Sequence, residues 1–186
     1  LYEVGGVSAL GGIHPRTLPN NSDGTISIEI LEKGIRHLDI HSPPTRLICL
    51  ENSHNLCQGS PIHPEYMMTV GDLAKRYGLK IHLDGARIFN AAVALKMPVS
   101  KLTEKVDSVM FCLSKGLSAP VGSLVCGSSE FIDKARKARK MVGGGMRQAG
   151  YLAAAGVISL VNLVDRLQED HENAKMLATQ ISQMEG

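Results

Sequence analysis

Three charged side chains follow two short apolar runs in the middle of the chain. The run KIHL ends in Asp84, with Arg87 three residues further on, and the run VMFCLS ends in Lys115. Short apolar runs bounded by turn residues are typical of buried strands. Because ligands bind beyond the carboxyl ends of parallel strands, we expect Asp84 and Lys115 to line the same opening.

Each of these side chains suits one task in holding a pyridine aldehyde and an amino acid. Lys115, directly after an apolar strand, is expected to be desolvated, which favours the neutral amine that a Schiff base requires. Asp84 supplies a carboxylate that can keep a pyridine nitrogen protonated. The planar guanidinium of Arg87 matches a substrate carboxylate. In combination they predict a lysine-bound aldehyde cofactor.

Ordinary structural roles stay open for the same residues. Asp84 could be the N-cap of a helix that begins at Gly85, accepting its free amides. Arg87 would then be a surface residue of the first helical turn. A strand that ends in Ser-Lys-Gly is common, so Lys115 alone is weak support for a covalent site.

The elements that must position these residues alternate along the chain. Short apolar runs predict strands at 46–51, 80–84, 106–114 and 122–127. Helical spacing of apolar residues predicts helices at 64–78, 86–95 and 129–142, and the long alanine-rich stretch 146–183 is expected to be helical. Residues 25–35 fit either a strand or a helix. This order predicts an α/β fold in which helices cover both faces of a mostly parallel sheet.

Composition narrows the class of protein. Hydrophobic residues make up 44% and charged residues 20% of the 186-residue chain, as in soluble globular proteins. A net charge of +2 does not indicate a nucleic acid or an anionic membrane as partner. The basic run 134–140 is interpreted as a solvated helix face. No apolar run reaches the ~18 residues of a membrane span.

Histidines and cysteines point to neither a metal site nor disulfides. His54, His63 and His82 lack the short ligand spacing of a zinc site, so no metal is expected. The four cysteines form no C-x-x-C pair, and three lie in apolar runs, so buried reduced thiols in a cytoplasmic protein are expected. The cysteines are Cys49, Cys57, Cys112 and Cys126.

Several longer motifs in fixed order resemble one enzyme family. HLDGARIFNA, SVMFCLSKGLSAPVGSLVCG and RKARKMVGGGMRQAGYLAAAGVISL, together with LYEVGG, LENSHN and RLQEDHENA, are similar to the L-threonine aldolases. The resemblance runs from residue 1 to about residue 178. It implies pyridoxal phosphate (PLP) as cofactor and the large domain of the fold-type-I, aspartate aminotransferase-type enzymes.

The resemblance also implies a role for individual residues. Lys115 matches the Schiff-base lysine, Asp84 the partner of the pyridine nitrogen, and Arg87 the arginine that holds the substrate carboxylate. His41 matches a histidine near the substrate hydroxyl, although a turn-stabilising role remains an alternative. Lys140 and Arg147 resemble basic residues that reach the cofactor phosphate or the substrate, across a subunit interface. An exposed place on the basic helix face remains the alternative for Lys140.

The implied reaction is the cleavage of threonine or allo-threonine to glycine and acetaldehyde, by a homo-oligomer that is a dimer of dimers in the family. Other fold-type-I enzymes, a β-eliminating lyase or an aminotransferase, remain the nearest alternatives. A non-catalytic remnant that keeps only the oligomer surface is the alternative from a different class.

Residues 1–186 are expected to form the central part of the PLP-binding large domain, incomplete at both ends. By the resemblance, a phosphate-binding cup and a ring-stacking histidine precede residue 1, and a small domain follows residue 186. We therefore expect this stretch alone to bind PLP weakly and to have little activity. The loop 56–63 is longer and more polar than is usual in the family, which leaves its structure open.

Overall fold

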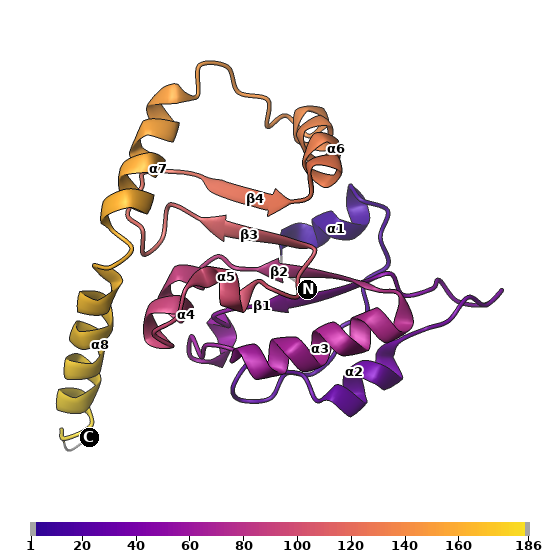
Figure 1. Cartoon of the computed structure of the whole chain (residues 1–186), viewed down its shortest axis with the longest axis horizontal. Coiled ribbons are helices and arrows are strands. Elements are labelled where there is room, and N and C mark those ends of the chain that lie inside the picture. The colour runs from indigo at the N-terminus through magenta and orange to yellow at the C-terminus, as the bar shows by residue number, and fades with distance from the viewer. Residues whose placement is uncertain (1–2, 185–186) are drawn as a thin grey trace.

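The computed structural model describes residues 3–184 and shows an α/β fold built on a four-stranded sheet (Figure 1). Its strands are β1 (Leu47–Glu51), β2 (Lys80–Asp84), β3 (Ser108–Cys112) and β4 (Ser123–Gly127). Its α-helices are α1 (Gly6–Ala9), α2 (Ile28–Gly34), α3 (Pro64–Tyr77), α4 (Ile88–Ala94), α5 (Val99–Leu102), α6 (Ser129–Met141), α7 (Gly150–Asn162) and α8 (Leu167–Ile181), and short 3-10 turns span Glu3–Gly5 and Asn55–Cys57.

The sheet follows chain order, β1-β2-β3-β4. β1, β2 and β3 run parallel, whereas β4 pairs with β3 antiparallel. The prediction of a mostly parallel sheet is therefore confirmed, and so are all four strands. The direction of β4 was not predicted, because a strand's apolar pattern does not depend on its direction.

Local chemistry explains where α3 begins and ends. Pro64 occupies the first helical position, where its missing N–H costs nothing. Gly78 ends the helix with φ 64°, a left-handed conformation that glycine adopts without strain. Between these residues Met67, Val70, Leu73 and Ala74 form one buried stripe. The predicted helix 64–78 is confirmed to within a residue.

The hydrophobic core lies between one face of the sheet and α3, α4 and α5, which lie in front of β1 and β2 in Figure 1. The alternating burial of β2 directs Ile81 and Leu83 into this core and leaves Lys80 and Asp84 exposed. The opposite face carries exposed side chains such as Cys49 and Val125. The expectation of a sheet flanked by helices is confirmed. On the face opposite the core, α6 lies against the end of β4, where a methyl group on Gly127 would come within 2.7 Å of the Phe131 ring.

The helical character expected over 146–183 is confirmed, in two helices whose junction was not predicted. The chain breaks between α7 and α8, which are bent by 72° relative to each other. Leu167, at the start of α8, is buried against Leu113 and Leu117 beyond β3, and this packing requires the change of direction. No single helix within residues 3–184 is long and apolar enough to cross a membrane. Only the bent pair α7 and α8, taken together, has the length and composition of a membrane span.

The prediction of buried thiols is wrong for the strand cysteines. Cys49 and Cys126 are exposed, and Cys57 and Cys112 are partly buried. Cys49 projects from the face of β1 opposite the core, and Cys126 lies on β4, where every residue is exposed. All four thiols are free.

Candidate active site

The candidate site lies at the carboxyl edge of the parallel strands. Asp84 ends β2 and is the register partner of Glu51, which ends β1. The backbone N–H of Asn52 donates to the carbonyl oxygen of Asp84 at 2.9 Å, and the N–H of Gly85 donates to the carbonyl oxygen of Met110 at 2.8 Å. These two bonds tie the end of β2 to both neighbouring strands and so fix the backbone of Asp84.

Asp84 presents its carboxylate on the open face of the sheet. Its Oδ1 accepts a hydrogen bond from the backbone N–H of Ala86 at 3.0 Å, which closes a tight turn after the strand. Helix α4 begins two residues later than expected, with Arg87 as its N-cap residue. The alternative of Asp84 as helix N-cap is therefore wrong, and its carboxylate is left exposed for another partner.

Lys115 lies in a tight loop directly after β3. The N–H of Ser118 donates to the carbonyl oxygen of Lys115 at 2.9 Å, and the N–H of Ala119 donates to that of Leu113, also at 2.9 Å. A methyl group on Gly116 would come within 3.0 Å of Oδ1 of Asn90, so this loop packs closely on α4. The loop therefore lies beside the helix that follows Asp84.

The expected burial of Lys115 is wrong for the described residues. Its side chain is exposed, because the core around Leu113 and Leu117 lies on the other side of the loop. The position of Lys115 at the carboxyl edge is confirmed, whereas its role stays a prediction.

Arg87 occupies the turn between Asp84 and α4 and is half-buried. It is the N-cap residue of α4 and not, as the alternative had it, a surface residue of the first turn. Burial of Ile88 directly after it anchors this turn in the core. The structure thus brings Asp84, Arg87 and Lys115 to one edge of the sheet.

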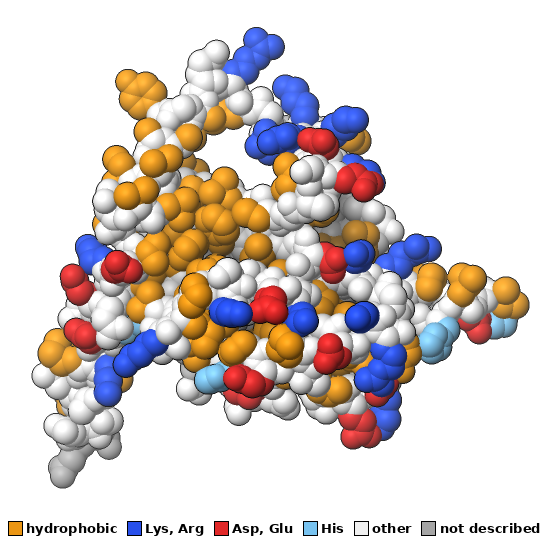
Figure 2. All heavy atoms as spheres, in the orientation of Figure 1, with side chains coloured by type: hydrophobic (Ala, Val, Ile, Leu, Met, Phe, Trp, Pro, Cys, Tyr) orange, Lys and Arg blue, Asp and Glu red, His pale blue; other side chains and the backbone are white. Residues whose placement is uncertain are grey.

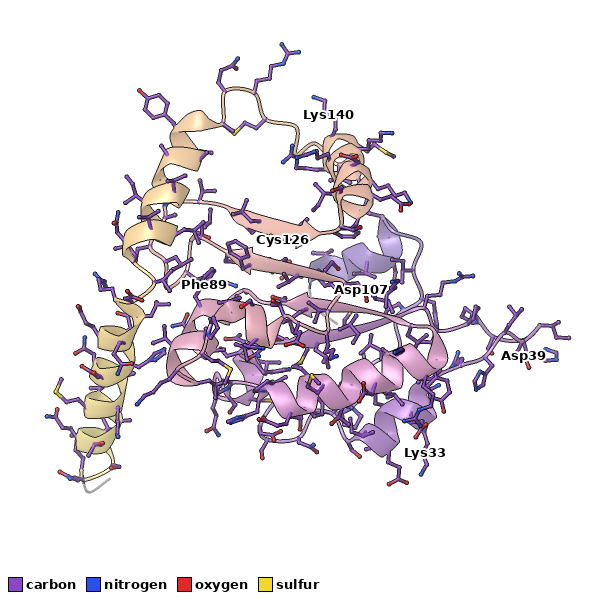
Figure 3. All side chains as sticks on the ribbon, viewed as in Figure 1. Lys33, Asp39, Phe89, Asp107, Cys126 and Lys140 are labelled. Atoms are coloured by element: carbon purple, nitrogen blue, oxygen red, sulfur yellow. The ribbon has the colours of Figure 1, made fainter. Side chains whose placement is uncertain are left out.

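His41 is not brought to that edge. It lies on a hairpin of residues 36–45, in which Asp39 bridges Ser42 and the N–H of His41 donates to Oδ1 of Asp39 at 2.6 Å. The hairpin leads directly into the amino end of β1 and projects away from the sheet, as the labelled Asp39 shows in Figure 3. His41 therefore lies at the end of the sheet opposite to Asp84.

Lys140 and Arg147 also lie apart from the candidate site. Lys140 is in the last turn of α6, and Arg147 is exposed on the connection to α7. Figure 3 places Lys140 at the outer end of α6, beyond β4, and Figure 2 shows basic side chains gathered over that helix. α6 buries no residue, which confirms the interpretation of the basic run 134–140 as a solvated face.

Two supporting residues of the site were missed in the sequence. Asn52 is fully buried, and its side chain bonds both backbone polar groups of Ile62, donating to the carbonyl oxygen at 3.1 Å and accepting from the N–H at 3.0 Å. His82 places Nδ1 2.8 Å from Oγ of Ser108 on the open face. The alternation of KIHLD is a signal that could have found His82, whereas Asn52 stands in the polar stretch ENSHN and gave no sign of its burial.

The residues at this edge fit a pyridine aldehyde. An accessible amine, an accessible carboxylate and a half-buried guanidinium project from one loop and one turn on neighbouring strands. A groove of about 680 Å³ lies elsewhere, between α4 and the α7–α8 junction, and Phe89, Val93 and Leu160 are among its lining residues. It appears as an apolar patch in Figure 2 and holds none of the three polar groups.

Comparison with known proteins is consistent with this geometry. The family model described as beta-eliminating lyase matches residues 1–186. The chain is 51% identical over 188 residues to the low-specificity L-threonine aldolase 1 of Arabidopsis thaliana, covering 100% of this chain and 52% of that protein. It is 45% identical over 181 residues to the low specificity L-threonine aldolase of Escherichia coli K12, covering 97% of this chain and 54% of that protein.

Solved structures show the same fold. The threonine aldolase of Leishmania major superposes with a TM-score of 0.81 at 19% identity, covering 97% of this chain and 53% of that one. The N-succinyldiaminopimelate aminotransferase of Mycobacterium tuberculosis superposes with a TM-score of 0.68 at 16% identity, covering 95% and 47%. The chain thus spans about half the length of the curated relatives it matches.

Proposed function

Because the chain belongs to the beta-eliminating lyase family, we propose that the protein containing it is a PLP-dependent aldolase. Its substrate is threonine or allo-threonine, and its products are glycine and acetaldehyde. Relatives whose sequences are 45% and 51% identical to this chain are named low-specificity L-threonine aldolases, which supports the substrate class. The observation that carries the proposal is the meeting of Asp84, Arg87 and Lys115 at the carboxyl edge of adjacent parallel strands.

Each residue at this edge has one task in the proposed reaction. Lys115 holds the cofactor aldehyde through its amine, and Asp84 holds a proton on the ring nitrogen. Arg87 binds the substrate carboxylate with two parallel N–H donors and so orients the bond to be broken. When bound, PLP supplies the electron sink for the Cα–Cβ electron pair.

The test of the covalent anchor is Lys115→Ala in the full-length protein. We expect the variant to lack the yellow absorbance of bound PLP and to lose retro-aldol activity. Lys175→Ala, which removes an exposed amine on α8, is the matched control and is expected to keep both. Yellow colour that survives dialysis in Lys115→Ala would show that another group anchors the cofactor.

The nearest alternatives are separated by their products. A protein incubated with threonine releases acetaldehyde and glycine if it is an aldolase, and a keto acid plus ammonia if it is a β-eliminating lyase. Amino transfer to an added keto acid identifies an aminotransferase. A remnant that keeps only the oligomer surface gives none of these products and binds no PLP.

The hairpin 36–45 supports a contribution of His41 to the site of another copy in a homo-oligomer. His41 cannot meet Asp84 of its own chain, and the hairpin carries two exposed apolar side chains, Leu38 at 87% and Ile40 at 95% exposure. Apolar groups so exposed favour burial against a partner surface. The dimer of dimers, the role of Lys140 and Arg147 at the cofactor or substrate, and the cytoplasmic location belong to the same proposal.

Mixing two inactive variants tests the hairpin. In a random mixture of His41→Ala and Lys115→Ala chains, one of the two sites in each mixed pair regains both residues. We expect about a quarter of the wild-type activity to return. If His41 acts in the site of its own chain, no activity returns.

A further inference from the structure

His82 occupies the same strand and the same face as Asp84, two residues earlier. Side chains alternate along β2, so Lys80, His82 and Asp84 all project to the open face. The register places Cys49 of β1 and Ser108 of β3 on either side of His82. Further along the same face lie Glu51, which ends β1 beside Asp84, and Cys112, which ends β3.

The ring of His82 is held in place by Ser108. Its Nδ1 lies 2.8 Å from Oγ of Ser108, a residue that is only 7% exposed. Within residues 3–184, His82 is the hydrogen-bonding partner of the Ser108 hydroxyl. The hydroxyl hydrogen therefore has an acceptor when it points at Nδ1. A buried hydroxyl whose hydrogen lacks an acceptor is costly, which favours this arrangement. The ring proton then resides on Nε2.

The surroundings also favour the uncharged ring. Burial lowers the pKa of His82 below its ordinary value of 6.5, and the Asp84 carboxylate opposes that shift. Lys80, the third side chain that β2 presents on this face, is paired with Asp107 at 2.7 Å. A neutral ring matters because an imidazolium beside Asp84 would compete with a pyridinium for the same carboxylate.

We propose that Ser108 locks His82 as the neutral Nε2–H tautomer, and that His82 in this form is a positioning residue that orients the carboxylate of Asp84 on the same face of β2. The inference rests on the proposed function, since it concerns the residue that faces the pyridine nitrogen. Alternate residues of a strand lie about 7 Å apart, a span that one bridging water covers. A donor at that span restricts the orientation of the carboxylate that accepts from it.

Three substitutions of His82 separate the N–H from the volume of the ring. The amide nitrogen of His82→Gln replaces Nε2, whereas that of His82→Asn replaces Nδ1. His82→Phe fills the space without a donor. In the full-length protein we expect His82→Gln to keep the PLP dissociation constant within about threefold, and His82→Asn and His82→Phe to weaken it about tenfold or more.

A second readout needs no cofactor. Nitrogen-15 spectra of the apo-protein at neutral pH are expected to show His82 neutral with its proton on Nε2. Ser108→Ala is expected to mix the two tautomers, and Ser108→Thr to preserve the single one. Circular dichroism verifies that each variant is folded before its binding is measured.

Two results would overturn the inference. One is a PLP affinity of His82→Phe equal to wild type, which would reduce His82 to a space-filling role. The other is an imidazolium or an Nδ1–H tautomer in the apo-protein. If instead the proposed function fails, the wild-type protein binds no PLP at all. The tautomer of His82 in the apo-protein then still tests whether Ser108 orders the ring.

Discussion

Gly85 offers the sharpest perturbation because it joins the strand that carries Asp84 to the turn that carries Arg87. A methyl group built on Gly85 would lie 2.8 Å from the carbonyl oxygen of Met110 and 3.1 Å from both Cβ of Ile88 and Cγ2 of Val109. The first of these atoms belongs to the backbone of β3 and accepts the Gly85 N–H. It therefore cannot turn aside as a flexible side chain does.

The expected cost of Gly85→Ala follows from two contributions. Overpacking a well-filled site costs about 1–3 kcal/mol. Separating the two strand ends also weakens a buried backbone hydrogen bond, worth about 1 kcal/mol. We therefore expect the free energy of unfolding to fall by about 2–4 kcal/mol and PLP affinity to fall with it, because Asp84 moves with Gly85.

Urea denaturation of the full-length protein measures the stability, and titration of the apo-protein with PLP measures the affinity. Gly150→Ala is the matched control, because a methyl group on Gly150 meets no atom within 4 Å and this residue begins α7. There the change is expected to be neutral or stabilising by up to about 1 kcal/mol. If Gly85→Ala unfolds at the same urea concentration as Gly150→Ala, the close approach of Gly85 to the Met110 carbonyl oxygen does not constrain this position, and the reasoning is refuted.

Three further predictions concern buried groups around the site. Asn52→Ala leaves both polar groups of Ile62 without their partner, so we expect a loss of about 2–4 kcal/mol in urea denaturation and faster hydrogen exchange of the Ile62 amide. Leu83→Ala empties a fully buried position and is expected to cost about 2–5 kcal/mol by the same assay; a loss below ~1 kcal/mol would contradict the core described above. Since the pKa of His82 is lowered by burial, the unfolded chain binds its proton first as pH falls, so stability from His82 is complete above pH 6.5 and is lost as pH falls from there toward the folded pKa. His82→Gln should flatten this part of the pH dependence of the melting temperature, and an unchanged profile would argue against a buried neutral ring.

Much of the architecture was predictable because its signals are local. The strands ending at Glu51 and Asp84 are short apolar runs closed by polar residues, and α3 carries both its proline start and its glycine stop. The rule that parallel strands open at one edge then placed Asp84 and Lys115 together. Residue types at fixed spacing were sufficient for this part of the site.

Other expectations failed where exposure depends on segments distant in sequence. Lys115 follows an apolar strand and was expected to be buried, yet its loop directs Leu113 and Leu117 inward and leaves the amine exposed. Cys49 lies in an apolar run and was expected to be buried, but it projects from the face of β1 opposite the core and is exposed. Hydrophobic pattern reports which residues can be buried, and packing decides which are.

By itself the sequence determined the four strands, the helices at α3, α4 and α6, and the edge at which the acid, the arginine and the lysine meet, because propensity, capping and turn chemistry act over a few residues. Only the tertiary structure decided the antiparallel direction of β4, the bend between α7 and α8, and the position of His41 on a projecting hairpin. It also decided the contact between His82 and Ser108, which are 26 residues apart. Such contacts depend on strand register, and register is set by burial summed over the whole sheet.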